Sequence, residues 1–190
     1  RPLVGLGQQN PAPLRVVFVH EAPQFFQIGV RLRQILAVRP LALDQVRDGE
    51  MNVLVDTNIL LDVLARREPF YAAAAEVWSL AERRDIRAFV SAISFNNVFY
   101  IVRKAEHQAK AKKAIRLIRD VFEVVAPDSQ IINQAMDDDV DDFEDAVQFH
   151  SAAKVRAACL ITRNPSHYPK SVFPILTAEE FLASRHRTGE

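Results

Sequence analysis

Short apolar runs alternate with longer segments of helical periodicity from Met51 to the end of the chain. The runs with strand character span residues 52–56, 86–91, 122–126, 159–162 and 173–176. The segments with helical character span residues 57–65, 69–84, 95–104, 108–120, 129–136, 141–157 and 178–183. Strands that are separated by helices pair in parallel through right-handed crossovers. The alternation therefore predicts a three-layer α/β/α sandwich with a central, mostly parallel sheet.

Several of the expected helices follow a side chain that accepts hydrogen bonds from free helix amides. The predicted N-caps are Thr57, Ser94, Asp128 and Thr177.

Residues 1–50 have a different character from the rest of the chain. They contain prolines at positions 2, 11, 13, 23 and 40 and show no sustained period. We expect residues 1–50 to be an N-terminal extension that is poorly ordered or non-native, with Met51 as the true start. Residues 51–190 are then expected to form the one folded domain.

Composition excludes some classes of protein. Hydrophobic residues make up 49% and charged residues 25%, the balance of a soluble globular chain. Because no apolar run approaches the roughly 18 residues that a spanning helix needs, no membrane segment is expected. The single cysteine, Cys159, allows no internal disulfide and fits a reducing compartment, so we expect a cytoplasmic protein.

The charges are segregated although the formal net charge is zero. Seven Lys or Arg residues lie between positions 103 and 119, against the one acid Glu106. Lys112, Arg116 and Arg119 share a helical face that suits a phosphate backbone. The plainer interpretation is an exposed helix with solubilising charge, and both interpretations stay open here.

Oxygen-bearing side chains are expected at one edge of the sheet. Asp56 ends the first strand, and Asn164 follows the fourth; open parallel sheets bind ligands at such carboxyl ends. Asp142 and Asp145 have the i, i+3 spacing that places two side chains on the same side of a helix. Converging carboxylates repel one another, and a hard divalent cation with oxygen ligands, such as Mg²⁺, relieves the repulsion. The alternative for Asp56 is a simple cap of the next helix.

Four motifs in order resemble the PIN domain family, closest to its VapC-type toxin branch. They are "VLVDTNILLDVL", "VSAISFNNVFYIVRK", "DDFEDAVQFHSAA" and "LITRNPSHYP", and the resemblance covers about residues 51–184. It implies a PIN-like α/β/α fold and a Mg²⁺- or Mn²⁺-dependent endoribonuclease. It also implies the toxin of a toxin–antitoxin pair, with an RNA substrate, a small antitoxin partner and a homodimer.

Carried over residue by residue, the resemblance assigns the following roles. Asp56, Asp142 and Asp145 are the implied catalytic acids and, with Asn164, the metal ligands. Asn58, Asn97 and Thr162 are supporting residues.

Three positions depart from the family pattern. Asn97 and Asn164 stand where the family carries acids, and His167 replaces a further acid. The alternative function is therefore a catalytically weakened PIN-like protein that binds RNA or a protein partner without cleavage. An aspartyl-phosphate phosphatase is disfavoured, because the second acid that it needs two residues after Asp56 is Asn58 here.

Overall fold

The computed structural model describes residues 51–138, 140–169 and 173–186. The expected N-terminal extension, residues 1–50, lies outside the described residues. The strands are β1 (Asn52–Val55), β2 (Arg87–Ser91), β3 (Glu123–Val125), β4 (Cys159–Ile161) and β5 (Ile175–Leu176). The α-helices are α1 (Thr57–Leu64), α2 (Tyr71–Glu82), α3 (Ala92–Ala105), α4 (Gln108–Val121), α5 (Ser129–Asp137), α6 (Phe143–Lys154) and α7 (Ala178–His186). A short 3-10 helix, η3, spans Pro165–His167.

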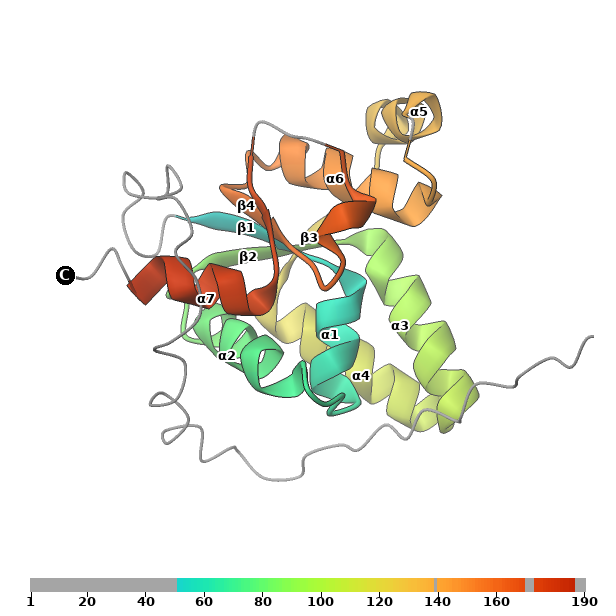
Figure 1. Ribbon diagram of the computed structural model, residues 1–190. Helices are drawn as coiled ribbons and strands as arrows, with labels where there is room; N and C mark the ends of the chain where they lie inside the picture. The colour runs from blue at the N-terminus through green and yellow to red at the C-terminus, as the bar shows by residue number, and fades with distance from the viewer. Residues whose placement is uncertain (1–50, 139, 170–172, 187–190) are drawn as a thin grey trace, which may run out of the picture.

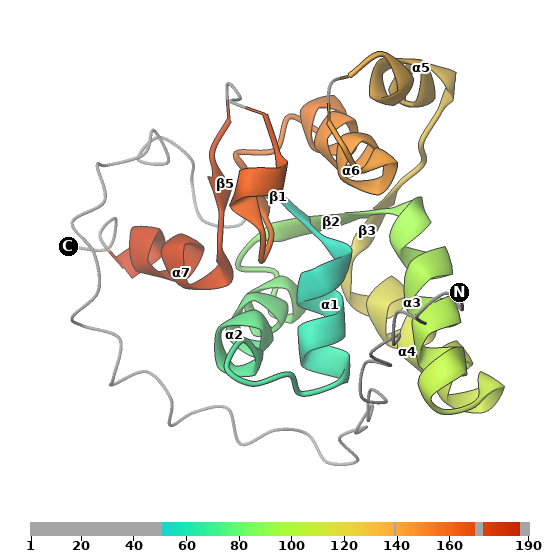
Figure 2. The same ribbon diagram turned by 45° about the vertical axis from the view of Figure 1, so that its right-hand side comes forward.

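The five described strands form one parallel sheet in the order β3-β2-β1-β4-β5. β1 is central, and its Val53 pairs with Ala88 of β2 on one side and with Cys159 of β4 on the other. Helix α6 covers one face of the sheet with α5 packed against it, and α1, α2, α4 and α7 lie on the other face (Figures 1 and 2). The predicted α/β/α sandwich with a parallel sheet is confirmed.

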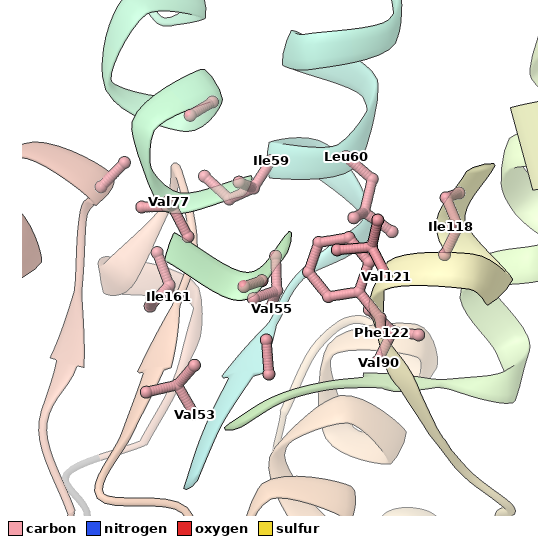
Figure 3. Packing of buried hydrophobic residues seen from close by; sticks show 14 of the residues in the cluster. Val53, Val55, Ile59, Leu60, Val77, Val90, Ile118, Val121, Phe122 and Ile161 are labelled. Carbon is pink, nitrogen blue, oxygen red and sulfur yellow. The ribbon is translucent and has the colours of Figure 1, made fainter. Parts of the chain in front are cut away.

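The hydrophobic core is divided by the sheet. Successive side chains of a strand point to opposite faces, so Val53 and Val55 enter one cluster and Leu54 enters the other. Figure 3 shows the larger cluster, in which Ile59 and Leu60 of α1 lie on the same side of the sheet as Val53 and Val55. Val53, Leu54 and Val55 are all fully buried. Burial on both faces explains why β1 is a continuous apolar run rather than an alternating one.

Two helices begin earlier than the capping pattern predicts. The N-cap of α1 is Asp56 rather than Thr57, and the N-cap of α3 is Ser91 rather than Ser94. Both N-cap residues have extended backbone angles, because each strand runs directly into its helix. The predicted caps at Asp128 and Thr177 are confirmed by hydrogen bonds from the amides of Ile131 and Glu180.

Within the described residues, no helix is both long enough and apolar enough to cross a membrane. Cys159 is a free, buried thiol at the start of β4, and burial raises its pKa to about 12. It therefore contributes to packing as a small apolar residue.

Candidate metal-binding and catalytic site

Asp56 lies at the carboxyl end of β1 and is only 3% exposed. Its backbone amide donates to the carbonyl of Ile161 on β4 at 3.0 Å, which fixes the end of the strand. Its side chain also accepts a hydrogen bond from the amide of Asn58, at 3.4 Å, in the first turn of α1. The plainer interpretation of Asp56 as a helix cap is therefore correct, but it accounts for only part of the environment of this carboxylate.

Donors from three separate elements reach the Asp56 carboxylate. Thr162, after β4, donates its hydroxyl to Oδ2 at 2.6 Å, and Gln148 of α6 donates from Nε2 to Oδ1 at 2.8 Å. The side-chain amide of Asn58 donates to Oδ2 as well. These bonds hold the carboxylate in one orientation at the junction of β1, β4 and α6.

Burial raises the pKa of Asp56 from 3.8 to about 6. The hydrogen bonds from Thr162 and Gln148 oppose this shift because they stabilise the anion, whereas the negative charge of Asp145 adds to it. Asp56 and Asp145 are therefore close enough for the charge of one to act on the other.

Asp145 occupies the first turn of α6, with 16% of its side chain exposed. Its Oδ1 accepts a hydrogen bond from the Tyr168 hydroxyl at 3.2 Å, and its Oδ2 lies 3.3 Å from Nδ1 of His167. Burial raises the pKa of Asp145, and the charge of Asp142 raises it further. Burial also raises the pKa of the Tyr168 hydroxyl, which keeps it protonated as a donor to Asp145.

Asp142 is exposed and serves as the N-cap of α6. Its Oδ1 accepts from the amides of Glu144 at 2.8 Å and Asp145 at 3.4 Å. The predicted proximity to Asp145 is present, but Oδ1 is committed to the helix end.

The loop after β4 is connected to the start of α1. The Thr162 hydroxyl accepts hydrogen bonds from Asn58 Nδ2 at 3.2 Å and from the amide of Asn164 at 3.1 Å. The amide of Arg163 donates to Asn58 Oδ1 at 3.0 Å. Asn58 and Thr162 thus contact the Asp56 carboxylate, and the backbone amide of Asn164 bonds Thr162.

Asn97 lies on α3, one turn after Ser94, and is half-buried. The Ser94 hydroxyl is hydrogen-bonded to Thr57 Oγ1 at 2.8 Å, which links the first turns of α1 and α3. Asn97 is therefore carried by the helix that starts at the same edge of the sheet as Asp56.

The sequence did not predict a further carboxylate at this site. Glu144 Oε1 accepts from the Thr57 hydroxyl at 2.7 Å and lies 3.4 Å from Gln148 Nε2. Gln148 is fully buried, and its amide nitrogen is shared between Asp56 and Glu144. The available signal was the i, i+4 spacing of Glu144 and Gln148, which places both on one face of α6.

The predicted RNA-binding side chains lie elsewhere. Lys112, Arg116 and Arg119 are exposed on α4, which packs against α3. α3 starts at the carboxyl ends of the strands, and α4 returns to the amino end of β3 (Figure 2). Arg119 is also paired with Asp120 at 2.7 Å. The structure does not bring these residues together with the acids.

The side chains at this site carry the oxygen ligands that a hard divalent cation prefers. Asp56 and Asp145 offer carboxylate oxygens whose pKa values are raised partly by neighbouring negative charge, which a cation would relieve. Within the described residues, no three or more His, Cys, Asp or Glu side chains lie together in an arrangement that could hold a metal ion. The fit therefore rests on the carboxylates of Asp56 and Asp145.

Three solved structures, all under 25% identical, share this fold. A chain of VapBC2 from Rickettsia felis, bound to a DNA fragment from their promoter, is 15% identical with a TM-score of 0.52, covering 66% of this chain and 97% of that chain. A chain of a toxin–antitoxin complex from Klebsiella pneumoniae is 20% identical with a TM-score of 0.51, covering 66% of this chain and 97% of that chain. DNA-bound VapBC from Salmonella typhimurium is 15% identical with a TM-score of 0.50, covering 67% of this chain and 98% of that chain.

No curated protein matches the sequence. A family model described as PIN domain matches residues 52–166, which include the β1 acid, the start of α6 and the loop after β4. Because this match extends over more than half of the chain, the protein belongs to the PIN domain family.

Proposed function

We propose that this PIN domain is a Mg²⁺- or Mn²⁺-dependent endoribonuclease. The observation that carries the proposal is the Asp56 carboxylate, which is almost fully buried at the carboxyl end of the central strand and is repelled by Asp145. A buried carboxylate beside a second one is costly unless a cation compensates for the charge. A divalent cation at this edge of the sheet accounts for both features.

Asp56 and Asp145 would hold the ion, with Asp142 and Asn164 as the further ligands. When bound, such an ion lowers the pKa of a coordinated water and offsets the charge of a phosphodiester. Thr162, Asn58 and Gln148 fix the direction of the Asp56 carboxylate through their hydrogen bonds. Tyr168 does the same for Asp145. These fixed orientations reduce the reorganisation that binding and catalysis require.

RNA is the proposed substrate, and the exposed basic face of α4 is its proposed contact surface. Lys112, Arg116 and Arg119 share one face of the helix and suit a phosphate backbone. Since these residues lie away from the strand ends, they would bind RNA at a distance from the cleaved bond.

The proposed biological role is the toxin of a toxin–antitoxin pair in the cytoplasm, acting as a homodimer with a small antitoxin as partner. Support comes from the printed descriptions of the structures with the same fold, which name VapBC and toxin–antitoxin complexes.

A second function, RNA or protein binding without cleavage, is favoured by a specific observation. Asn97 and Asn164 are neutral, and the described residues hold no grouped set of three acidic, histidine or cysteine ligands. Fewer anionic ligands weaken the binding of divalent cations.

A cleavage assay on the full chain separates the two functions. We expect Mn²⁺-dependent cleavage of a mixed RNA pool that EDTA abolishes and that is lost in both Asp56→Asn and Asp145→Asn. The exposed-acid variant Asp137→Asn is the control and should cleave normally. RNA binding without Mn²⁺-dependent cleavage would replace the nuclease proposal with the binding function.

A further inference from the structure

A second buried carboxylate, Asp62, lies on α1 and is not part of the site described above. Its side chain has no solvent exposure, and its neighbours are two arginines. Arg163 Nη1 donates to Asp62 Oδ1 at 3.1 Å, and Arg67 Nη1 lies 3.6 Å from the same oxygen. Arg163 and Arg67 are 29% and 20% exposed, so the pairs lie near the surface on the arginine side only.

Stability alone does not explain this buried charge. Asp62 Oδ2 and Arg67 Nε are buried without a hydrogen-bond partner among the described residues. Burial raises the pKa of Asp62, while the charges of Arg163 and Arg67 lower it. Buried ion pairs that leave polar atoms unsatisfied contribute little, and well-packed apolar residues often stabilise such positions better. A different benefit of this arrangement is therefore expected.

The ion pair is continuous with the bonds that orient Asp56. Arg163 belongs to the loop after β4, between Thr162 and Asn164. Its backbone amide donates to Asn58 Oδ1 at 3.0 Å, and Asn58 Nδ2 donates to the Asp56 carboxylate. Asn58 is thus held between this loop and Asp56.

The guanidinium of Arg163 is held on two sides. It bonds Asp62 and lies 4.9 Å from the centre of the Phe70 ring, which precedes α2. Arg67 shares the same carboxylate, but its backbone amide bonds the carbonyl of Asp62 within the turn after α1. Of the two arginines, Arg163 is the one that belongs to the loop whose backbone amide bonds the Asn58 side chain.

We infer that Asp62 is a positioning residue: by pairing with Arg163 it holds the loop after β4 so that Asn58 and Thr162 keep the Asp56 carboxylate in place. This inference deepens the proposed function, because the position of Asp56 is what metal binding requires. The contacts that carry the positioning role are made between protein side chains and backbone, so they can be measured apart from metal binding.

Arg67→Met is the matched control for Arg163→Met. Each substitution removes one guanidinium that pairs with the Asp62 carboxylate. Only Arg163→Met also changes a residue of the loop after β4. The first readout is the pair of NMR signals of the Asn58 side-chain amide, recorded on the full chain without metal. The second is the Mn²⁺ dissociation constant from calorimetry.

We expect Arg163→Met and Asp62→Asn to move the Asn58 signals and to weaken Mn²⁺ binding about 10-fold, the lower end of the effect of outer-shell residues on metal affinity. Arg67→Met should leave the Asn58 signals unchanged and the Mn²⁺ affinity within about 2-fold of the wild-type value. Arg163→Lys, the conservative variant, should keep both the signals and the affinity of the wild type. The lysine variant and Asp62→Asn also serve if Arg163→Met does not fold.

Equal responses of the Asn58 signals to Arg163→Met and Arg67→Met, or no response to Arg163→Met and Asp62→Asn, would overturn the positioning role. If the wild-type chain binds no Mn²⁺ while the Asn58 signals still follow Arg163, the proposed metal-dependent function fails and the positioning role stands.

Discussion

Asp56 combines a helix cap, three side-chain hydrogen bonds and a raised pKa in one buried carboxylate. Its pKa is about 6 in the folded chain against 3.8 for the ordinary group. Between these values the folded state binds more protons than the unfolded state, so stability falls as the pH rises from about 4 to about 6. Above the folded pKa the loss is complete and constant. The metal-free site therefore destabilises the fold at neutral pH.

Asp56→Asn should accordingly stabilise the metal-free protein at pH 8 by about 1 to 3 kcal/mol, since one pKa unit corresponds to about 1.4 kcal/mol. At pH 4 the variant should differ little from the wild type. Urea unfolding at both pH values measures the effect, with Asp137→Asn as the exposed-carboxylate control. A destabilised variant at pH 8 would contradict the assigned cause of the pKa shift.

At the scale of the element, α6 orients most of the candidate site through its first turns. Asp142 caps the helix, and Glu144, Asp145 and Gln148 follow within two turns. The cap and the acid can be separated by substitution, because serine caps a helix without a charge.

Asp142→Ala should lower the free energy of unfolding by about 1 kcal/mol, and Asp142→Ser should retain most of the stability. If Asp142 also holds the ion, both variants should bind Mn²⁺ more weakly. Thermal unfolding and calorimetry measure the two effects. Equal stability of the alanine variant and the wild type would show that the Asp142 cap contributes nothing.

The basic face of α4 makes a separate prediction. Replacing Lys112, Arg116 and Arg119 with Gln should weaken RNA binding and reduce the slope of log K against log salt by about 2, since each phosphate contact on a single strand contributes about 0.7. Fluorescence anisotropy at several salt concentrations measures this. The control replaces the exposed arginines Arg66, Arg84 and Arg156, which lie outside α4. An equal loss in both triple variants would remove the specific role of α4.

The order of strands and helices could be predicted from the sequence because buried parallel strands and amphipathic helices have different periods. The exact helix starts could not. Asp56 and Ser91 are at least as good N-cap residues as Thr57 and Ser94, so capping preference does not choose between them. The strands end at Val55 and Ser91, and the chain turns there. Tertiary pairing of the sheet therefore decides where α1 and α3 begin.

At the scale of the whole molecule, the sequence predicted Asp56, Asp142 and Asp145 as site residues. It did not predict the side chains that contact them. Glu144, Gln148 and Tyr168 lie within the quoted motifs, but the resemblance assigns none of them a role. Their roles arise from contacts between α6, the loop after β4 and the strand ends, which are far apart in the sequence.

The described strands and helices of residues 51–186 pack into two hydrophobic clusters, one on each face of the sheet. A chain of residues 51–190 should therefore fold alone, with a melting temperature within about 4 °C of the full chain, the shift that about 1 kcal/mol produces in a domain of this size. Circular dichroism measures this. A truncated chain without a cooperative transition would contradict the proposed domain boundary at Met51.

Mn²⁺ titration of the full chain by calorimetry, with Asp56→Asn and Asp145→Asn alongside, tests the central claim most directly. The account predicts one site that the wild type fills and that both variants lose, with affinity rising as the pH passes the Asp56 pKa of about 6. Absence of binding, or binding that neither substitution changes, would contradict a metal site at the end of β1.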